Sequence, residues 1–172
     1  MIRVPEASEY APYYARYISL VPAGDIIDTL DQQCEKTRFV LSNLDESEGD
    51  NRYAPDKWTV KEVLGHVIDT ERIMSYRALR ISRKDKTPLP GFEQDDYIRN
   101  GPYTTPELTC LLEEFHTVRR STMLMFTHLA PEAWDRTGIA NGDEVSVRAL
   151  AWIIAGHEIH HRRILKAKYL GL

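Results

Sequence analysis

The chain has 172 residues, of which 42% are hydrophobic and 28% charged, and its formal net charge is −4 at pH 7. This length predicts one domain, residues 1–172, that can bury a sizeable core. The composition excludes collagen, a disordered tail and a disulfide scaffold, and the mild acidity argues against a generic nucleic-acid binder.

Neither export nor membrane insertion is indicated by the sequence. The segment Met1–Glu6 lacks the basic and apolar regions of a signal peptide, and no apolar run approaches the ~18 residues of a membrane span. Cys34 and Cys110 are too few for a disulfide framework and are expected to be reduced thiols. We therefore expect a cytoplasmic protein that does not enter a membrane.

Residues 1–23 are expected to form an irregular N-terminal strap. Prolines interrupt this segment at positions 5, 12 and 22. Its tyrosines are expected to pack over the domain rather than to form a stacking platform; they are Tyr10, Tyr13, Tyr14 and Tyr17.

A first long helix is predicted from Asp25, which is a suitable N-cap, to about Asn43. The stretch that follows, residues 45–51, is polar and contains four acidic residues. This composition predicts a solvated loop that ends the helix.

The second helix has a clear start in the sequence, because Thr59 and Glu62 fit a capping box. Apolar residues then recur at helical spacing and predict a helix that ends near Ser82. Basic residues gather at that end, where the helix dipole favours cations and explains them without an anionic partner; they are Arg77, Arg80, Arg83 and Lys84.

Residues 85–104 are rich in proline and glycine and predict a long connection with one short helical turn at Glu93–Ile98. Connections of this length in a compact domain are often functional. Asp95, Asp96 or Tyr97 could orient a substrate if this loop borders the site. The alternative is that these residues only cap the short helix.

Two further helices are predicted in the second half of the chain. The third runs from Thr104–Pro106 to about Leu129. A connection over residues 131–143 follows, and a short hairpin within 137–145 is one alternative there. The fourth helix runs from Ser146 nearly to Leu170. Four helices with long connections predict an all-α four-helix bundle.

Two histidines of the fourth helix lie in its apolar stripe. His157 and His161 are four residues apart, so their rings lie one above the other on the face that should point into the bundle. Buried imidazoles need polar partners, and one metal ion satisfies both. The alternative is that each is a hydrogen-bonded core residue, as we expect for His116 and His128.

His66 is the candidate for a third ligand. It lies at the flank of the apolar stripe of the second helix, where a residue normally lies at the boundary between core and surface. It could join the other two histidines if the second and fourth helices meet along this flank. Three histidines would leave positions open for water or substrate, which is the catalytic pattern. Imidazoles suit zinc, nickel, copper or iron(II), and their spacing does not choose among these metals.

Other polar residues near these histidines have candidate supporting roles. His160 could hydrogen-bond a carboxylate beside the metal or be a boundary residue, and Asp69 lies near His66 in the sequence. Glu71 lies near the centre of the second helix's apolar stripe, where a carboxylate is costly unless paired. We expect an arginine such as Arg119 or Arg148 to pair with it, with a general-base role as the alternative.

Three segments of the chain form a recognisable set: KWTVKEVLGHVIDTER at 57–72, KTPLPGFEQDDY at 86–97 and AGHEIHH at 155–161. Together they resemble the DinB/YfiT-like metalloenzymes. Each segment alone is modest evidence, but their order and separation together are specific. The matching blocks extend from about Tyr53 to Tyr169.

The resemblance implies a four-helix bundle that holds a divalent metal, nickel or zinc, and that often forms a homodimer. The family pattern places its ligands at His66, His157 and His161. Some relatives transfer low-molecular-weight thiols such as bacillithiol, mycothiol or glutathione, and others are described as hydrolases. The family name suggests DNA damage but implies no nucleic-acid partner.

Three functions are therefore expected in order of preference. The first is a metal-dependent transfer of a low-molecular-weight thiol to a small electrophile, and its preference rests on the resemblance alone. The second is a metal-dependent hydrolase that uses water, and the third is a metal-stabilised stress or binding protein without turnover. No residue receives a catalytic role from the sequence.

Overall fold

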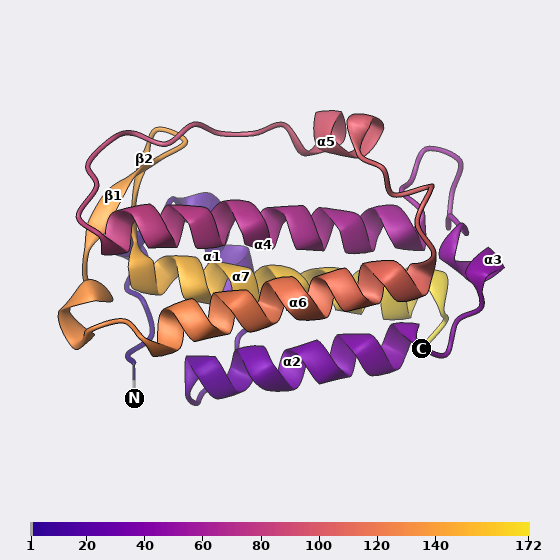
Figure 1. Ribbon diagram of the computed structural model, residues 1–172, viewed down its shortest axis with the longest axis horizontal. Coiled ribbons are helices and arrows are strands. Elements are labelled where there is room, and N and C mark those ends of the chain that lie inside the picture. Colours follow the sequence, from indigo (N-terminus) through magenta and orange to yellow (C-terminus); the bar gives the residue numbers. More distant parts are fainter. Residues whose placement is uncertain (1) are drawn as a thin grey trace.

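A computed structural model describes residues 2–172; Met1, the first residue of the expected strap, lies outside the described part. Long helices pack side by side as a bundle (Figure 1). They are α2 (Ile26–Leu41), α4 (Val60–Ser82), α6 (Leu108–Thr127) and α7 (Val147–Ile164). Helix α4 packs against α6 and α7, and α2 packs against the same two helices from the other side. The predicted four-helix bundle is confirmed.

The connection between α4 and α6 crosses the whole bundle. Helices α4 and α6 run in the same direction, so residues 83–107 return along the outside of α4 (Figure 1). This crossover carries α5 (Gln94–Asn100), which is the short helix predicted at Glu93–Ile98. Residues 91–95 of this crossover line the same cavity as His66, so the crossover passes close to that part of α4.

Side-chain caps explain where the long helices begin. Thr59 Oγ1 accepts the Glu62 N–H at 3.0 Å, and Glu62 accepts the Thr59 N–H at 2.7 Å, so the predicted capping box is confirmed. Asp25 and Ser146 each accept a first-turn N–H at 2.9 Å in α2 and α7. Each bond satisfies a donor that the helix itself leaves free.

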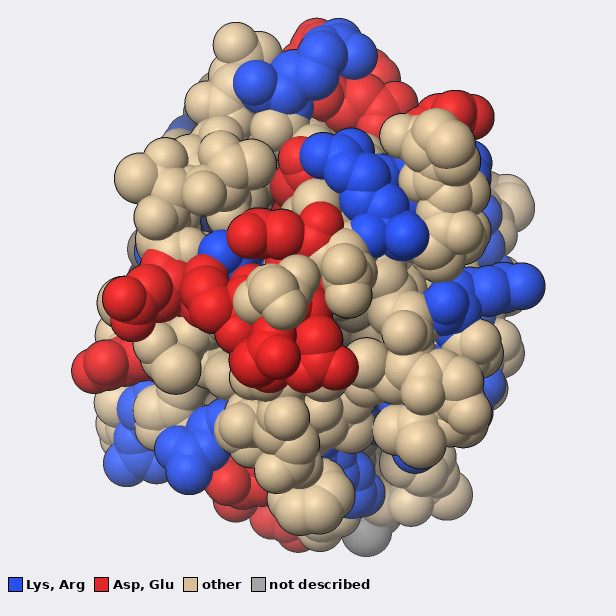
Figure 2. All heavy atoms as spheres, turned by 90° about the vertical axis from the view of Figure 1, so that its right-hand side faces the viewer, with Lys and Arg blue, Asp and Glu red and all other residues tan. Residues whose placement is uncertain are grey.

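The loop predicted over residues 45–51 is wrong in part, because Glu46–Gly49 forms the single-turn helix α3. Asp45 and Glu48 make a second capping box there, which the acidic composition hid. Figure 2 looks onto this end of the bundle, where acidic side chains gather. The buried Lys61 of α4 forms ion pairs with Glu46 and Asp50, so these acids also hold the segment on the bundle.

The N-terminal strap is more regular than predicted. It contains the 3-10 turns Ala7–Glu9 and Pro12–Tyr14 and then α1 (Ala15–Ile18). Pro12 opens the second turn, a position where its missing N–H costs nothing. Helix α1 packs on α7, where a Cβ on Gly156 would lie 2.0 Å from the Tyr17 carbonyl oxygen. Glycine at this position therefore permits the close approach of the strap.

One predicted helix start is wrong, whereas the predicted end of the fourth helix is confirmed. Helix α6 begins at Leu108 rather than at Thr104, because the Thr105 N–H donates to the Pro102 carbonyl at 3.0 Å and closes a separate turn. The fourth helix continues nearly to Leu170 as predicted, because α7 ends at Ile164 and a π-helix follows it directly to Tyr169.

The hairpin considered within residues 137–145 is present. Strands β1 (Thr137–Ala140) and β2 (Asp143–Ser146) pair in antiparallel register. Asn141 and Gly142 connect them with φ of 54° and 88°, as a two-residue Asn-Gly turn requires.

The bundle core has two apolar clusters with polar side chains between them. One cluster lies around Met74, Phe126 and Ile153, and the other around Leu64 and Leu111. Buried polar residues occupy the intermediate turns; they are Gln33, Thr37, His66, Thr70, Glu71, Arg119, His157, Glu158 and His161. Within residues 2–172, no helix is both long enough and apolar enough to cross a membrane.

Candidate metal centre

Three histidine side chains converge where α4 packs against α7. The Nε2 atom of His157 lies 3.0 Å from Nε2 of His66 and 3.1 Å from Nε2 of His161. One ligand atom from each ring lies within 4.8 Å of the others. The rings are buried, with residue exposures of 4%, 6% and 9% for His66, His157 and His161. The structure thus brings together all three predicted ligands.

The surroundings keep these imidazoles neutral. Burial lowers the pKa of His66 to about 4. Burial also holds the pKa of His157 and of His161 well below the ordinary value, and repulsion from the neighbouring imidazoles acts in the same direction. Neutral imidazole is the form that binds a metal ion.

The donor geometry fits a divalent ion. Zinc–nitrogen bonds of 2.0–2.1 Å in a tetrahedron place ligand nitrogens about 3.3 Å apart. The two measured Nε2–Nε2 distances, 3.0 and 3.1 Å, need only small adjustments to reach that spacing. Three imidazole donors also leave coordination positions free for water or substrate.

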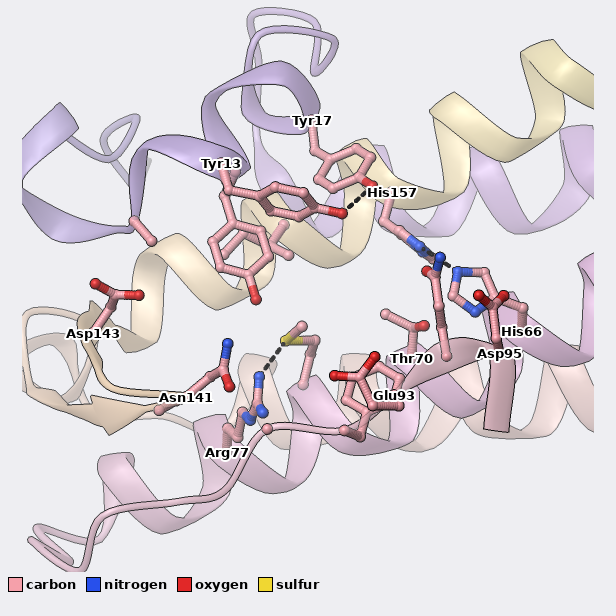
Figure 3. A pocket seen from close by; sticks show the side chains of 18 residues that line it. Tyr13, Tyr17, His66, Thr70, Arg77, Glu93, Asp95, Asn141, Asp143 and His157 are labelled. Atoms are coloured by element: carbon pink, nitrogen blue, oxygen red, sulfur yellow. Dashed lines mark hydrogen bonds between the residues drawn. The ribbon is translucent and has the colours of Figure 1, made fainter. Parts of the chain in front are cut away.

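Two of the three histidines, His66 and His157, open onto a cavity of about 450 Å³. His66 and His157 lie in its wall, below the strap tyrosines and beside the crossover (Figure 3). The volume is that of an ordinary small-molecule site. A ligand of modest size can therefore reach the histidines.

Tyr17 is a site residue that sequence reasoning missed. Its ring meets the His157 ring edge-to-face with 5.3 Å between centroids, and its hydroxyl accepts a hydrogen bond from Arg16 Nη2 at 2.9 Å. Burial raises the pKa of Tyr17, so its hydroxyl stays protonated and can donate. Tyr13 and Tyr14 line the same cavity, so three of the four strap tyrosines contribute to the site as well as pack on the domain.

Thr70 was also missed, although it lies one helical turn after His66. It lines the cavity, and its buried Oγ1 has no hydrogen-bond partner within residues 2–172. A buried hydroxyl without a partner is costly. Its position four residues from His66 was the available signal.

The structure separates the loop residues predicted to orient substrate. Asp95 lines the histidine cavity, and its charge opposes the lowering of the pKa of His66 by burial. Asp96 and Tyr97 line a different cavity of about 430 Å³, together with Asp69. The Asp69 carboxylate accepts a hydrogen bond from Tyr103 there. Only Asp95 is therefore brought to the histidines.

His160 fits the boundary alternative. Its ring lies against the rings of Tyr17 and His161, with centroids 5.3 and 5.0 Å apart. Within residues 2–172, no carboxylate lies within 4.0 Å of it in an ion pair.

Glu71 has the arginine partner that its position predicts. Arg119 Nε and Nη2 donate to its two carboxylate oxygens at 2.9 and 2.8 Å. Arg148 instead pairs with Glu9 and Asp135. A fully paired carboxylate is structural, so the general-base alternative loses its support.

The cysteines are free, as predicted. Cys34 is buried, its Sγ lies 3.6 Å from His116 Nδ1, and burial raises the pKa of its thiol to about 11. Cys110 is exposed. Neither belongs to the histidine cavity.

Solved structures share this fold. YfiT from Bacillus subtilis, proposed to be a metal-dependent hydrolase with an unusual four-helix bundle topology, superposes with a TM-score of 0.75 at 13% identity, over 95% of this chain and 89% of YfiT. A mycothiol-dependent maleylpyruvate isomerase gives a TM-score of 0.67 at 15% identity, over 84% of this chain and 61% of the isomerase.

Sequence comparison agrees with the structural likeness. The chain is 23% identical over 129 residues to OB0413 of Oceanobacillus iheyensis, named as a proposed metal-dependent hydrolase, and the alignment covers 73% of each protein. The model of the DinB superfamily matches residues 29–165, which include all three converging histidines. The chain therefore belongs to the DinB superfamily.

Proposed function

We propose that this protein is a metal-dependent hydrolase of small molecules, with a divalent ion held by His66, His157 and His161. The observation that carries the proposal is the convergence of three buried imidazole nitrogens, two of which belong to histidines in the wall of an open cavity. The names of OB0413 and YfiT support the same reaction class. Nickel and zinc both suit the donor set.

When bound, the ion would supply Lewis acidity, which lowers the pKa of a water molecule toward neutrality. The residues of the chain would provide the other functions. Asp95 is the carboxylate placed to accept a proton from water near His66. The Tyr17 hydroxyl would donate a hydrogen bond to the substrate oxygen that gains charge, and Thr70 Oγ1 would orient the substrate.

Thiol transfer to an electrophile is the second candidate. It uses the same centre with a low-molecular-weight thiol in the place of water, and the fold shared with a mycothiol-dependent isomerase supports it. A cavity of about 450 Å³ would have to hold both the thiol and the electrophile. We therefore place hydrolysis first, since it requires only one organic ligand.

Activity assays on the metal-loaded protein separate the candidates. We expect activated esters or amides to be cleaved in a metal-dependent manner, with activity lost in His161→Ala and retained in His160→Ala, the matched control. Conjugation of glutathione, bacillithiol or mycothiol to a haloarene without hydrolysis would reverse the order. If chelation unfolds the protein and no substrate reacts, the metal-stabilised binding protein is favoured. The expected homodimer stays a prediction that sedimentation velocity can test.

A further inference from the structure

Arg77 is a buried cation with neutral partners. The residue is 3% exposed, and its guanidinium donates to the Pro90 carbonyl at 2.6 Å and contacts Met74 Sδ at 3.5 Å. No carboxylate within residues 2–172 forms an ion pair with it. A buried charge is costly unless an opposite charge accompanies it. The helix dipole explains the exposed Arg83 nearby, but it does not explain why Arg77 is buried.

Arg77 faces the same cavity as the histidines. It follows His66 by 11 residues, which is about 16 Å along α4 and a rotation of only about 20°. Thr70 and Met74 lie between them and also line the cavity. Figure 3 shows His66 and His157 at one end and Arg77 at the other, beside Asn141. The cavity is therefore an elongated site with a metal centre at one end and a cation at the other.

The wall around Arg77 is held in place by backbone pairing. The Leu89 N–H donates to the Ile139 carbonyl, and the Asn141 N–H donates to the Leu89 carbonyl, both at 2.9 Å. A Cβ on Gly91 would lie 2.0 Å from Asn141 Oδ1, so any larger residue would displace the Asn141 side chain from this contact. The crossover and the hairpin thus form one rigid surface that positions the Pro90 carbonyl on Arg77.

Acidic residues also line the cavity, and their placement limits what Arg77 can bind. Glu93, Asp95 and Asp143 are exposed, so water solvates their carboxylates. Arg77 is buried and lacks that solvation. Repulsion from the three acids disfavours ligands with several negative charges, whereas a single carboxylate can satisfy the guanidinium.

We propose that Arg77 binds the carboxylate of the substrate, so that the protein acts on small, elongated monocarboxylic acids whose reactive group reaches the histidines. The guanidinium can present two parallel N–H donors to a carboxylate, a geometry that lysine or an amide does not reproduce. The assignment to substrate rests on the proposed hydrolase function. The binding of a carboxylate at Arg77 can be measured independently of that function.

Isothermal titration calorimetry with 4-phenylbutyrate and its neutral amide tests the proposal on the metal-loaded protein. We expect the acid to bind at least about tenfold more tightly than the amide, and Arg77→Met to remove this preference. Arg83→Met, at the exposed residue that directly follows α4, is the control that keeps this preference. Equal binding of acid and amide by the wild type, or a preference that survives in Arg77→Met, would overturn the proposal.

Two further measurements keep the test decisive. If Arg77→Met does not fold, the Arg77 Nε–H resonance of the wild type is expected to shift with the acid and not with the amide, and the absence of a shift overturns the proposal. His161→Ala is expected to keep the acid preference; its loss would place the carboxylate on the metal instead. Because the titration measures binding rather than turnover, the acid preference can persist where ester cleavage is absent, which separates failure of this inference from failure of the proposed function.

Discussion

Glu71 and Arg119 form an ion pair inside the bundle, with the two side chains 2% and 1% exposed and 2.8 Å between Oε2 and Nη2. Arg119 Nη1 also donates to the Leu30 carbonyl at 2.8 Å, so the pair links α2, α4 and α6. It lies in the same polar layer as the histidines. The pair therefore ties the helix that carries His66 to its neighbours.

Breaking this pair should be more costly than replacing it. We expect Glu71→Leu or Arg119→Leu alone to lower the free energy of unfolding by about 3–5 kcal/mol, because each leaves an uncompensated buried charge. The double substitution should cost less than either single change. Urea unfolding of the three variants tests this, and single effects below about 1 kcal/mol would contradict it.

Gly156 should be needed for the position of the strap. Gly156→Ala places a methyl group against the Tyr17 carbonyl oxygen, which is backbone and cannot rotate away. We expect a loss of about 1–3 kcal/mol of stability and a lower kcat/KM, because Tyr17 moves away from His157. Gly49→Ala is the control, since its new methyl is close only to the flexible Lys61 side chain and lies at an ordinary contact distance of 3.6 Å from Leu108 Cβ. If Gly156→Ala and Gly49→Ala lower stability and kcat/KM equally, the need for glycine beside Tyr17 is contradicted.

Thr70→Val is expected to lower activity without lowering stability. The substitution removes a buried hydroxyl that has no partner within residues 2–172, so stability should stay unchanged or rise by about 1 kcal/mol. The kcat/KM of ester hydrolysis should nevertheless fall, because Thr70 lines the cavity and we propose that its Oγ1 orients the substrate. Thermal unfolding and steady-state kinetics on the same preparation test both parts. A destabilised variant with full activity is the opposite outcome.

The metal-free protein should lose stability in acid. The folded pKa of His66 is lowered from 6.5 to about 4, so between these values the unfolded chain binds a proton that the folded chain does not. The free energy of unfolding should therefore fall as the pH drops from about 6.5 to 4, by about 3 kcal/mol for His66 alone. Urea unfolding of chelator-treated wild type and His66→Gln across this range measures the difference. If the free energies of unfolding of the two proteins change with pH in parallel, the lowered pKa of His66 is contradicted.

Much of the fold follows from local sequence signals. The capping box at Thr59 and Glu62 and the helical spacing after it predict α4 to its last residue. The same kind of signal at Asp45 and Glu48 was hidden by an acidic stretch that resembles a loop. The start of α6 at Leu108 depends on a turn closed by Pro102, which helix periodicity does not reveal.

Site residues could be predicted from residue spacing only where they lie on the same helix. His157 and His161 follow from their spacing on one face, whereas His66 joins them only because α4 and α7 pack together. Tyr17 comes from the strap, and its contact with His157 depends on tertiary packing. Asp95 and Asp96 are neighbours in sequence but face different cavities, because successive residues of α5 point in different directions.

Metal content measured by inductively coupled plasma mass spectrometry tests the central claim most directly. We predict about one nickel or zinc ion per chain in the wild type and in His160→Ala after reconstitution and removal of free metal. His161→Ala should retain almost none while remaining folded by circular dichroism. A wild type that binds no divalent metal, or a His161→Ala variant with a full equivalent, would contradict the three-histidine centre.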